Sequence, residues 1–417
     1  MRRFLCIFLL LISSVSLAQE VSEIGFQENK RSKTSFLKNL VELRPGMPLD
    51  SAQLERDVNL LIRLAGVSHA YFQVHPKDDG SVKVTYGVQD NFTLIPQLNV
   101  YTTNDDEFAF RAGLYEYNFL GRNITIGGFY QDDIFSSFGL NFRAPNLFSR
   151  KLGIAVNYQD LTTLEPVFLD AGDADYRYNN TSFEVLGLYQ FNFFHSAQLG
   201  VNFFNEDYRY IEGVTQDGVP LDFDVNKILF KGIYEYRNVD FYYQYLEGFR
   251  STLNLQYVIS SDVVLPDFLI GFNDFIYYKR IGKRGNWASR LRLGLATNSD
   301  SPFAPFAVDN NLNIRGVGNI IDRGTGVIVL NTEYRHTLVD KDWFVLQGNV
   351  FVDSGSWRNP GGDLGDFGDS QNLRVYPGVG LRFIHKRIFN AIFRIDYGYG
   401  ITDKATRGFV FGIGQYF

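Results

Sequence analysis

The sequence lacks the residues that would supply a disulfide framework or a thiolate metal site. Its 417 residues include one cysteine, Cys6, and two methionines. A single cysteine forms no intramolecular disulfide. The five histidines are scattered along the chain without the close spacing of metal ligands. We therefore expect no metal site and no cofactor.

Long apolar runs are also missing. No stretch after the N-terminus has the roughly eighteen consecutive apolar residues of a transmembrane helix. The N-terminus has Arg2 and Arg3, then an apolar run from Phe4 to Ile12, then the small-x-small pattern Ser16-Leu17-Ala18. That run is too short to cross about 30 Å of hydrocarbon. We predict that residues 1–18 are a secretory signal peptide cleaved after Ala18.

Basic residues are fewer than acidic ones. Lysine and arginine number 40 against 46 aspartate and glutamate, for a formal net charge of −6. A chain with this net charge is not expected to have the basic surface that binding of a nucleic acid requires. No nucleophile elbow, Walker loop or dinucleotide fingerprint occurs. Asp353-Ser354-Gly355 has no second copy with which to form an aspartic-protease dyad. We expect a protein that is not an enzyme.

Aromatic residues and glycine are abundant, with 39 Phe, 25 Tyr and 39 Gly. From residue 91 onward the chain reads as segments of about ten residues that alternate between apolar and polar positions. In one of them Phe393, Ile395 and Tyr397 alternate with Arg394 and Asp396. Charges opposite an apolar face favour a water-filled barrel with an apolar outside. We count about sixteen such strands, an even number as in closed bacterial barrels.

The links between these strands alternate in length. Long links are predicted over Asp160–Asn180 and Glu206–Asn226, and short links over Phe119–Arg122 and Ile281–Asn286. In outer-membrane barrels the short turns lie in the periplasm and the long loops outside. This parity predicts that the N-terminal domain lies in the periplasm.

Residues 19–90 have a different pattern. Val21–Phe26 reads as a strand, Thr34–Val41 as a helix, and Asp50 can cap a second helix with a leucine-rich face. Two alternating strands follow, the second beginning at Val82. The order β-α-α-β-β predicts a small sheet with two helices. The predicted organisation is thus a signal peptide at 1–18, this domain at 19–90, and the barrel at 91–417.

The chain resembles the BamA/TamA superfamily, also called the bacterial surface antigen family. The N-terminal unit resembles a POTRA domain, and the barrel carries motifs similar to those of the family in the same order. They are Asn118-Phe119-Leu120-Gly121-Arg122, Asn313-Ile314-Arg315-Gly316-Val317, Phe351-Val352-Asp353-Ser354-Gly355 and Phe409–Phe417. Two features depart from the family pattern. Val317 stands where Phe or Tyr is usual, and a single POTRA-like unit fits where assembly factors have several.

The resemblance implies that the loop carrying Arg315 and Gly316 folds back into the barrel lumen, between strands eleven and twelve. It also implies that Arg315 pairs with an inward-facing acid. Alternation independently places Asp353 and Glu333 on inward faces. A charge-assisted pair would hold the loop as a latch. The alternative is an ordinary solvated arginine in a glycine-containing loop.

The first and last strands must meet to close the barrel. Pro96 lies in the predicted first strand, Phe92–Tyr101, and proline cannot donate to a ladder. The last strand carries Gly412 and Gly414 and ends at Phe417. Two interpretations stay open: a bend where the chain enters the membrane, or a seam that is weak by design.

Taken together, the sequence and the resemblance predict a mainly β protein, a transmembrane antiparallel barrel of about 16 strands preceded by a POTRA-like periplasmic domain. The resemblance implies an outer-membrane assembly or polypeptide translocation factor. Its expected partners are outer-membrane lipid, unfolded or extended polypeptide clients and other envelope assembly proteins. A client segment would add as a strand to the POTRA-like sheet. The alternative, from another class, is a channel or structural barrel whose seam stays shut.

Overall fold

The computed structural model describes residues 19–102, 108–169, 171–242, 244–261, 267–308, 313–318, 322–386, 388 and 391–417. The predicted signal peptide lies outside these residues. The chain divides into two compact units, one reaching to Asn91 together with Leu120–Asn123, and one made of the remainder. No helix in the described part of the chain is long and apolar enough to cross a membrane.

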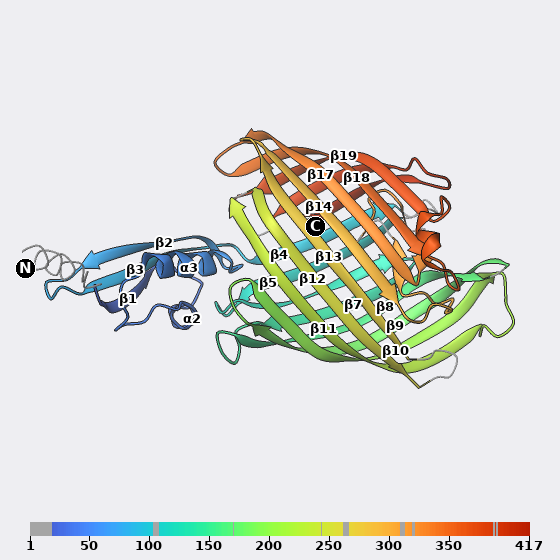
Figure 1. Ribbon diagram of the computed structural model, residues 1–417, viewed down its shortest axis with the longest axis horizontal. Coiled ribbons are helices and arrows are strands. Elements are labelled where there is room, and N and C mark those ends of the chain that lie inside the picture. Colours follow the sequence, from blue (N-terminus) through green and yellow to red (C-terminus); the bar gives the residue numbers. More distant parts are fainter. Residues whose placement is uncertain are drawn as a thin grey trace, which may run out of the picture. The chain divides into compact units, whose positions relative to one another are not determined.

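The N-terminal unit has the predicted β-α-α-β-β order. Its elements are β1 (Val21–Gln27), α2 (Thr34–Leu40), α3 (Ser51–Ile62), β2 (Val67–Pro76) and β3 (Val82–Asp90). The sheet order is β1-β3-β2, with β1 parallel and β2 antiparallel to β3 (Figure 1). Asp50 caps α3 as predicted, because its carboxylate accepts a hydrogen bond from the Ala52 amide at 2.9 Å. In the order β1-β3-β2 the central strand is β3, so β1 and β2 are the edge strands of this sheet.

A buried acid joins the helices of this unit to its central strand. Asp57 of α3 is 1% exposed. Its carboxylate accepts hydrogen bonds from the amides of Glu42 (2.7 Å) and Leu43 (3.1 Å) and from the Tyr86 hydroxyl (2.8 Å). Burial, with the nearby Asp57 carboxylate second, raises the pKa of Tyr86. Helical periodicity places Asp57 beside Leu54 and Leu61, but its polar role is set by chain segments that only the fold brings together.

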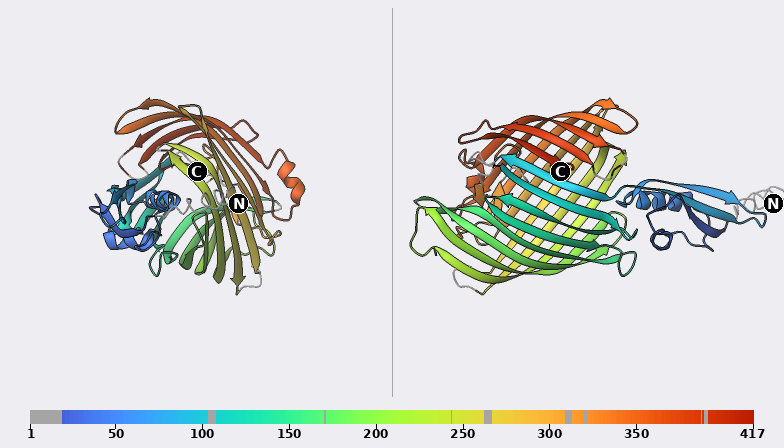
Figure 2. Two further views of the ribbon diagram at one scale, coloured as in Figure 1. Left: turned by 60° about the vertical axis from the view of Figure 1, so that its left-hand side comes forward. Right: turned by 180° about the vertical axis from the view of Figure 1, so that it is seen from behind.

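The second unit is a closed barrel of sixteen strands, which confirms the predicted fold class and strand number (Figure 2). The strands are β4 (Leu94–Thr102), β5 (Phe108–Phe119), β6 (Ile124–Asp133), β7 (Phe135–Ala144), β8 (Leu152–Leu169), β9 (Gly172–Gln190), β10 (His195–Gly213), β11 (Asp222–Tyr242), β12 (Tyr245–Ser260), β13 (Phe268–Ile281), β14 (Gly285–Ala296), β17 (Gly326–Asp340), β18 (Phe344–Arg358), β19 (Leu373–His385), β20 (Ile392–Tyr399) and β21 (Arg407–Ile413). All neighbouring strands pair antiparallel, and β21 closes the ring against β4.

Alternation along the strands sorts side chains between the two faces of the barrel wall. On β18, Val350 and Val352 are 55% and 42% exposed, whereas Asn349 and Asp353 are 5% and 0% exposed. The apolar side chains thus cover the outside and the polar ones fill the interior. This is the distribution expected of strands between hydrocarbon and an aqueous lumen.

The two long links predicted from the sequence are wrong. The chain continues as strand through most of both, with β8 reaching Leu169, β9 starting at Gly172, β10 reaching Gly213 and β11 starting at Asp222. Alternating tyrosines stabilise these extensions. Tyr176 and Tyr208 are nearly fully buried and pack with Phe223. Polar residues on the opposite face give these segments a composition typical of loops. For this reason the sequence predicted long links where the structure has strands.

The segment between β14 and β17 holds the short strands β15 (Phe306–Val308) and β16 (Asp322–Gly324), which pair with each other. Between β18 and β19 lies the 3-10 helix η1 (Leu364–Gly368). In this loop the carboxylates of Asp363, Asp366 and Asp369 accept backbone hydrogen bonds from Gly365, Asn359 and Gln371. Within the described residues no group of three or more His, Cys, Asp or Glu could hold a metal ion.

Candidate functional site

The segment 313–318 lies between β14 and β17, which are the eleventh and twelfth strands of the barrel. Ile314 and Val317 are 0% and 2% exposed and pack in an apolar cluster with Trp357 and Tyr376. Val317 is therefore enclosed by apolar side chains.

Gly316 is fixed by space and by backbone conformation. Its φ is +97°, and a Cβ there would lie 2.7 Å from the carbonyl oxygen of Gly398. Only glycine adopts this conformation without strain at such a close approach. The glycine lets the chain pass against β20 and aim the preceding residue, Arg315, into the barrel wall.

The structure brings Arg315, Asp353 and Glu333 together. Arg315 is 0% exposed. Its Nε and Nη2 donate to the two carboxylate oxygens of Asp353 at 2.7 and 2.9 Å, and its backbone amide donates to the same group at 3.0 Å. Its Nη1 donates to Glu333 at 2.8 Å. The guanidinium also lies over the Phe351 ring, 3.6 Å from the centroid. The planar fork of arginine allows this bidentate contact, which lysine could not make.

The surrounding charges form a network rather than a single pair. Glu333 also accepts from Arg335 at 2.5 Å and from Arg382 at 2.9 Å. Asp396 lies 3.6 Å from Arg315 Nη1 and accepts from Arg394 at 3.2 Å. Asp353 accepts three hydrogen bonds from Arg315. Buried charges are tolerated only when paired in this way.

Sequence reasoning placed Asp396 and Arg394 on an inward face but did not connect them to Arg315. It did not find Arg382. Alternation reports which face a side chain occupies, but it does not report the height at which that side chain meets its neighbours across the lumen.

The junction between β21 and β4 is short. Three residue pairs join them, Val410 with Tyr101, Phe411 with Val100, and Gly412 with Asn99. Among the described strands, each of the other fifteen barrel junctions has seven or more pairs. Pro96 pairs with Leu114 of β5 and lies on the part of β4 that has no partner in β21.

The last residues of the chain differ from their predicted place in the final strand. Strand β21 ends at Ile413, and Gly414 has a φ of +104°. The C-terminus then lies within the outline of the barrel in every view (Figures 1 and 2). Tyr416 lies at Arg315, with its ring centroid 4.5 Å from the guanidinium carbon. Phe417 packs against an apolar cluster on β11–β14 that includes Ile276 and Tyr278. The tail therefore contacts the opposite wall instead of extending the seam.

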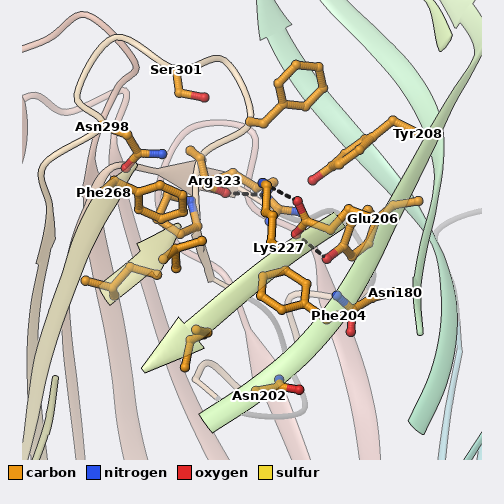
Figure 3. A pocket seen from close by; sticks show the side chains of 17 residues that line it. Asn180, Asn202, Phe204, Glu206, Tyr208, Lys227, Phe268, Asn298, Ser301 and Arg323 are labelled. Carbon is orange, nitrogen blue, oxygen red and sulfur yellow. Dashed lines mark hydrogen bonds and ion pairs between the residues drawn. The ribbon is translucent and has the colours of Figure 1, made fainter. Parts of the chain in front are cut away.

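A cavity of about 220 Å³ lies inside the barrel (Figure 3), and its lining includes no residue of the Arg315 network. Side chains of β9–β13, the segment 298–305 and Arg323 line it. Aromatic rings form part of its wall. The ring centroids of Tyr208 and Phe303 are 4.7 Å apart, and the ring centroids of Tyr178 and Tyr208 are 4.6 Å apart.

Comparisons with known proteins agree with this architecture. Residues 19–91 match the POTRA family, described as a surface antigen variable number repeat. No curated protein matches the chain.

Solved structures match nearly the whole length. BamA from Haemophilus ducreyi lacking POTRA domains 1-3 aligns with a TM-score of 0.55 and 14% identity, covering 95% of this chain and 84% of that one. CdiB from Acinetobacter baumannii aligns with a TM-score of 0.62 and 14% identity over 95% of this chain and 74% of that one. CdiB from Escherichia coli gives a TM-score of 0.57 and 10% identity over 97% and 92%. At these identities the likeness establishes the fold. The chain thus consists of one POTRA domain followed by a sixteen-stranded barrel with the fold of BamA and CdiB.

Proposed function

We propose that this protein handles polypeptides at the outer membrane, as an assembly or translocation factor. Its POTRA domain would lie in the periplasm and receive extended client segments, and the junction between β21 and β4 would serve their entry into the membrane or passage across it. No covalent step is needed for this role, so we propose that the protein is not an enzyme. The observation that carries the proposal is the three-pair junction.

The energetics of that junction support opening. A net hydrogen bond contributes about 0.5–1.5 kcal/mol. If each residue pair supplies about one bond, the junction is held by roughly 3 kcal/mol. Every other junction among the described strands has at least seven pairs and is correspondingly stronger. A barrel that parts along one line would part there.

The POTRA sheet is suited to strand addition. Strand β3 is central, so β1 and β2 each leave one backbone edge unpaired within the sheet. An extended polypeptide can satisfy such an edge with main-chain hydrogen bonds, with little dependence on its sequence. This mode suits unfolded clients of varied sequence.

A second candidate is a channel or structural barrel whose seam stays shut. The contacts of Tyr416 and Phe417 inside the barrel favour it, because they tie the end of the last strand to Arg315 and to the opposite wall. For opening to occur, either these contacts must break or the tail must stay in place while β4 moves.

A crosslink across the seam discriminates the two functions. We would replace Val100 and Phe411, which face each other across the junction, with cysteines in the otherwise cysteine-free mature chain. A matched pair at Leu255 and Gly271 joins β12 to β13. In a strain depleted of the native protein, outer-membrane proteomics should show loss of function for the oxidised seam pair and recovery with reductant. The β12–β13 crosslink should be harmless. Full function of the oxidised seam variant would support the closed barrel instead.

A further inference from the structure

The cavity inside the barrel contains hydrogen-bonding groups that the protein does not satisfy. The Oδ1 atoms of Asn202 and Asn298 are buried and have no hydrogen-bond partner among the described residues. Both residues line the cavity. They lie at opposite ends of the view in Figure 3, with Asn298 near Ser301. Leaving a buried polar group without a hydrogen bond is unfavourable, so two such groups around one cavity call for a ligand or ordered water.

The charges that line the cavity cancel. Lys227 is paired with Glu206, which also accepts a hydrogen bond from Tyr178 at 2.8 Å. Arg323 is paired with Glu165. A charged ligand would leave an uncompensated buried charge, which is strongly unfavourable. The occupant that fits is neutral.

The remaining groups define its chemistry. A carboxamide both donates and accepts hydrogen bonds, as does the Ser301 hydroxyl. Ligand hydroxyls do the same and therefore suit such groups in either orientation. The rings of Phe204, Phe268 and Phe303 also line the cavity. Their negative faces attract the weakly positive C–H groups of a saturated ring.

Size restricts the ligand further. Pockets for drug-sized ligands measure about 300–1,000 Å³. A cavity of about 220 Å³ is smaller. An extended peptide spans more than such a space, whereas one six-membered ring fits. We propose that this cavity binds a single neutral sugar ring, supplied as a free monosaccharide or as the terminal residue of a glycan.

This site is separate from the proposed polypeptide handling and can be tested without it. Full-length protein would be purified in a zwitterionic detergent, because sugar-based detergents would compete. Calorimetry and saturation-transfer NMR would measure binding of D-glucose, D-galactose and N-acetyl-D-glucosamine. A soluble oligosaccharide that ends in the bound sugar distinguishes the two sources. Tighter binding of the oligosaccharide indicates a glycan, and binding of the monosaccharide alone indicates the free sugar.

Three leucine substitutions of similar size locate the site. Asn202→Leu and Asn298→Leu each remove one carboxamide from the cavity. The control, Asn205→Leu, makes the same change on β10 at a residue that does not line this cavity and whose amide bonds instead to Asp224 and Asn226. We expect each cavity variant to weaken binding about fivefold to tenfold, the value of one hydrogen bond, and the control to leave it unchanged.

The thermal midpoint of Asn202→Leu distinguishes a role of Asn202 in ligand binding from a role in stabilising the barrel. Because the Asn202 oxygen has no partner, Asn202→Leu should hold or raise the thermal midpoint while binding falls. If Asn202→Leu does not fold, Asn202→Ala replaces it. Absence of binding by all three sugars, or binding that neither cavity variant weakens, would overturn the proposal and leave water as the occupant.

Discussion

Substitution of Arg315 is the most demanding test of the charge network. In Arg315→Ala the Asp353 carboxylate loses the three hydrogen bonds that Arg315 donates, while Glu333 keeps Arg335 and Arg382. Breaking a buried ion pair from one side costs about 3–5 kcal/mol because the other charge stays buried. The barrel ladders do not include Arg315, so we expect a closed but less stable barrel with a displaced loop and impaired function in a depletion strain.

A second substitution added to Arg315→Ala identifies which buried carboxylate causes the loss of stability. Asp353→Asn added to Arg315→Ala removes the stranded charge and should recover at least about 1 kcal/mol. Glu333→Gln added to Arg315→Ala should recover nothing, because it deprives Arg335 and Arg382 of their acid. This asymmetry is specific to the observed hydrogen bonds.

Tryptophan fluorescence during urea unfolding can measure both effects. Trp357 is 5% exposed and packs with Ile314 and Val317, whereas Trp287 and Trp343 are 43% and 48% exposed on the outside. Replacing the two outer tryptophans with phenylalanine leaves Trp357 as the reporter of the loop. Equal unfolding midpoints for Arg315→Ala and its parent, or equal recovery by both second substitutions, would refute the reasoning.

Three further predictions address the POTRA domain and the tail. Asp57→Ala removes the acceptor of four hydrogen bonds, and it should cost about 3 kcal/mol because the partly exposed Gln53 amide can bond to water instead. We expect a lower midpoint in urea and a smaller loss for Asp57→Asn; equal stability would contradict the role of Asp57 in joining the helices to the central strand. The raised pKa of Tyr86 means that the unfolded chain releases this proton first, so stability should fall as pH rises above about 10, and Tyr86→Phe should remove that part of the dependence in urea titrations at pH 8 and 11. Deleting residues 415–417 removes the contacts of Tyr416 and Phe417 inside the barrel and should raise single-channel conductance; an unchanged conductance would show that the tail does not obstruct the lumen.

The sequence by itself determined the strand count, and within the strands it predicted it also determined which side chains face inward, including those of Glu333 and Asp353. It also determined the start of α3, because the Asp50 cap bonds to a residue two positions away. Strand alternation and helix capping are local geometry, so a single chain segment contains the information.

Only the tertiary structure decided which inward groups meet. Arg315 and Asp353 lie 38 residues apart, and Arg382 reaches Glu333 across 49. The extension of β8–β11 depends on tyrosines that pack between strands, and the inward course of Tyr416 and Phe417 depends on contacts with Arg315 and with the opposite wall. These outcomes depend on the stagger of the strands around the closed ring, which fixes the height of each side chain in the lumen. That stagger is a property of all sixteen strands together, so no local pattern in the sequence contains it.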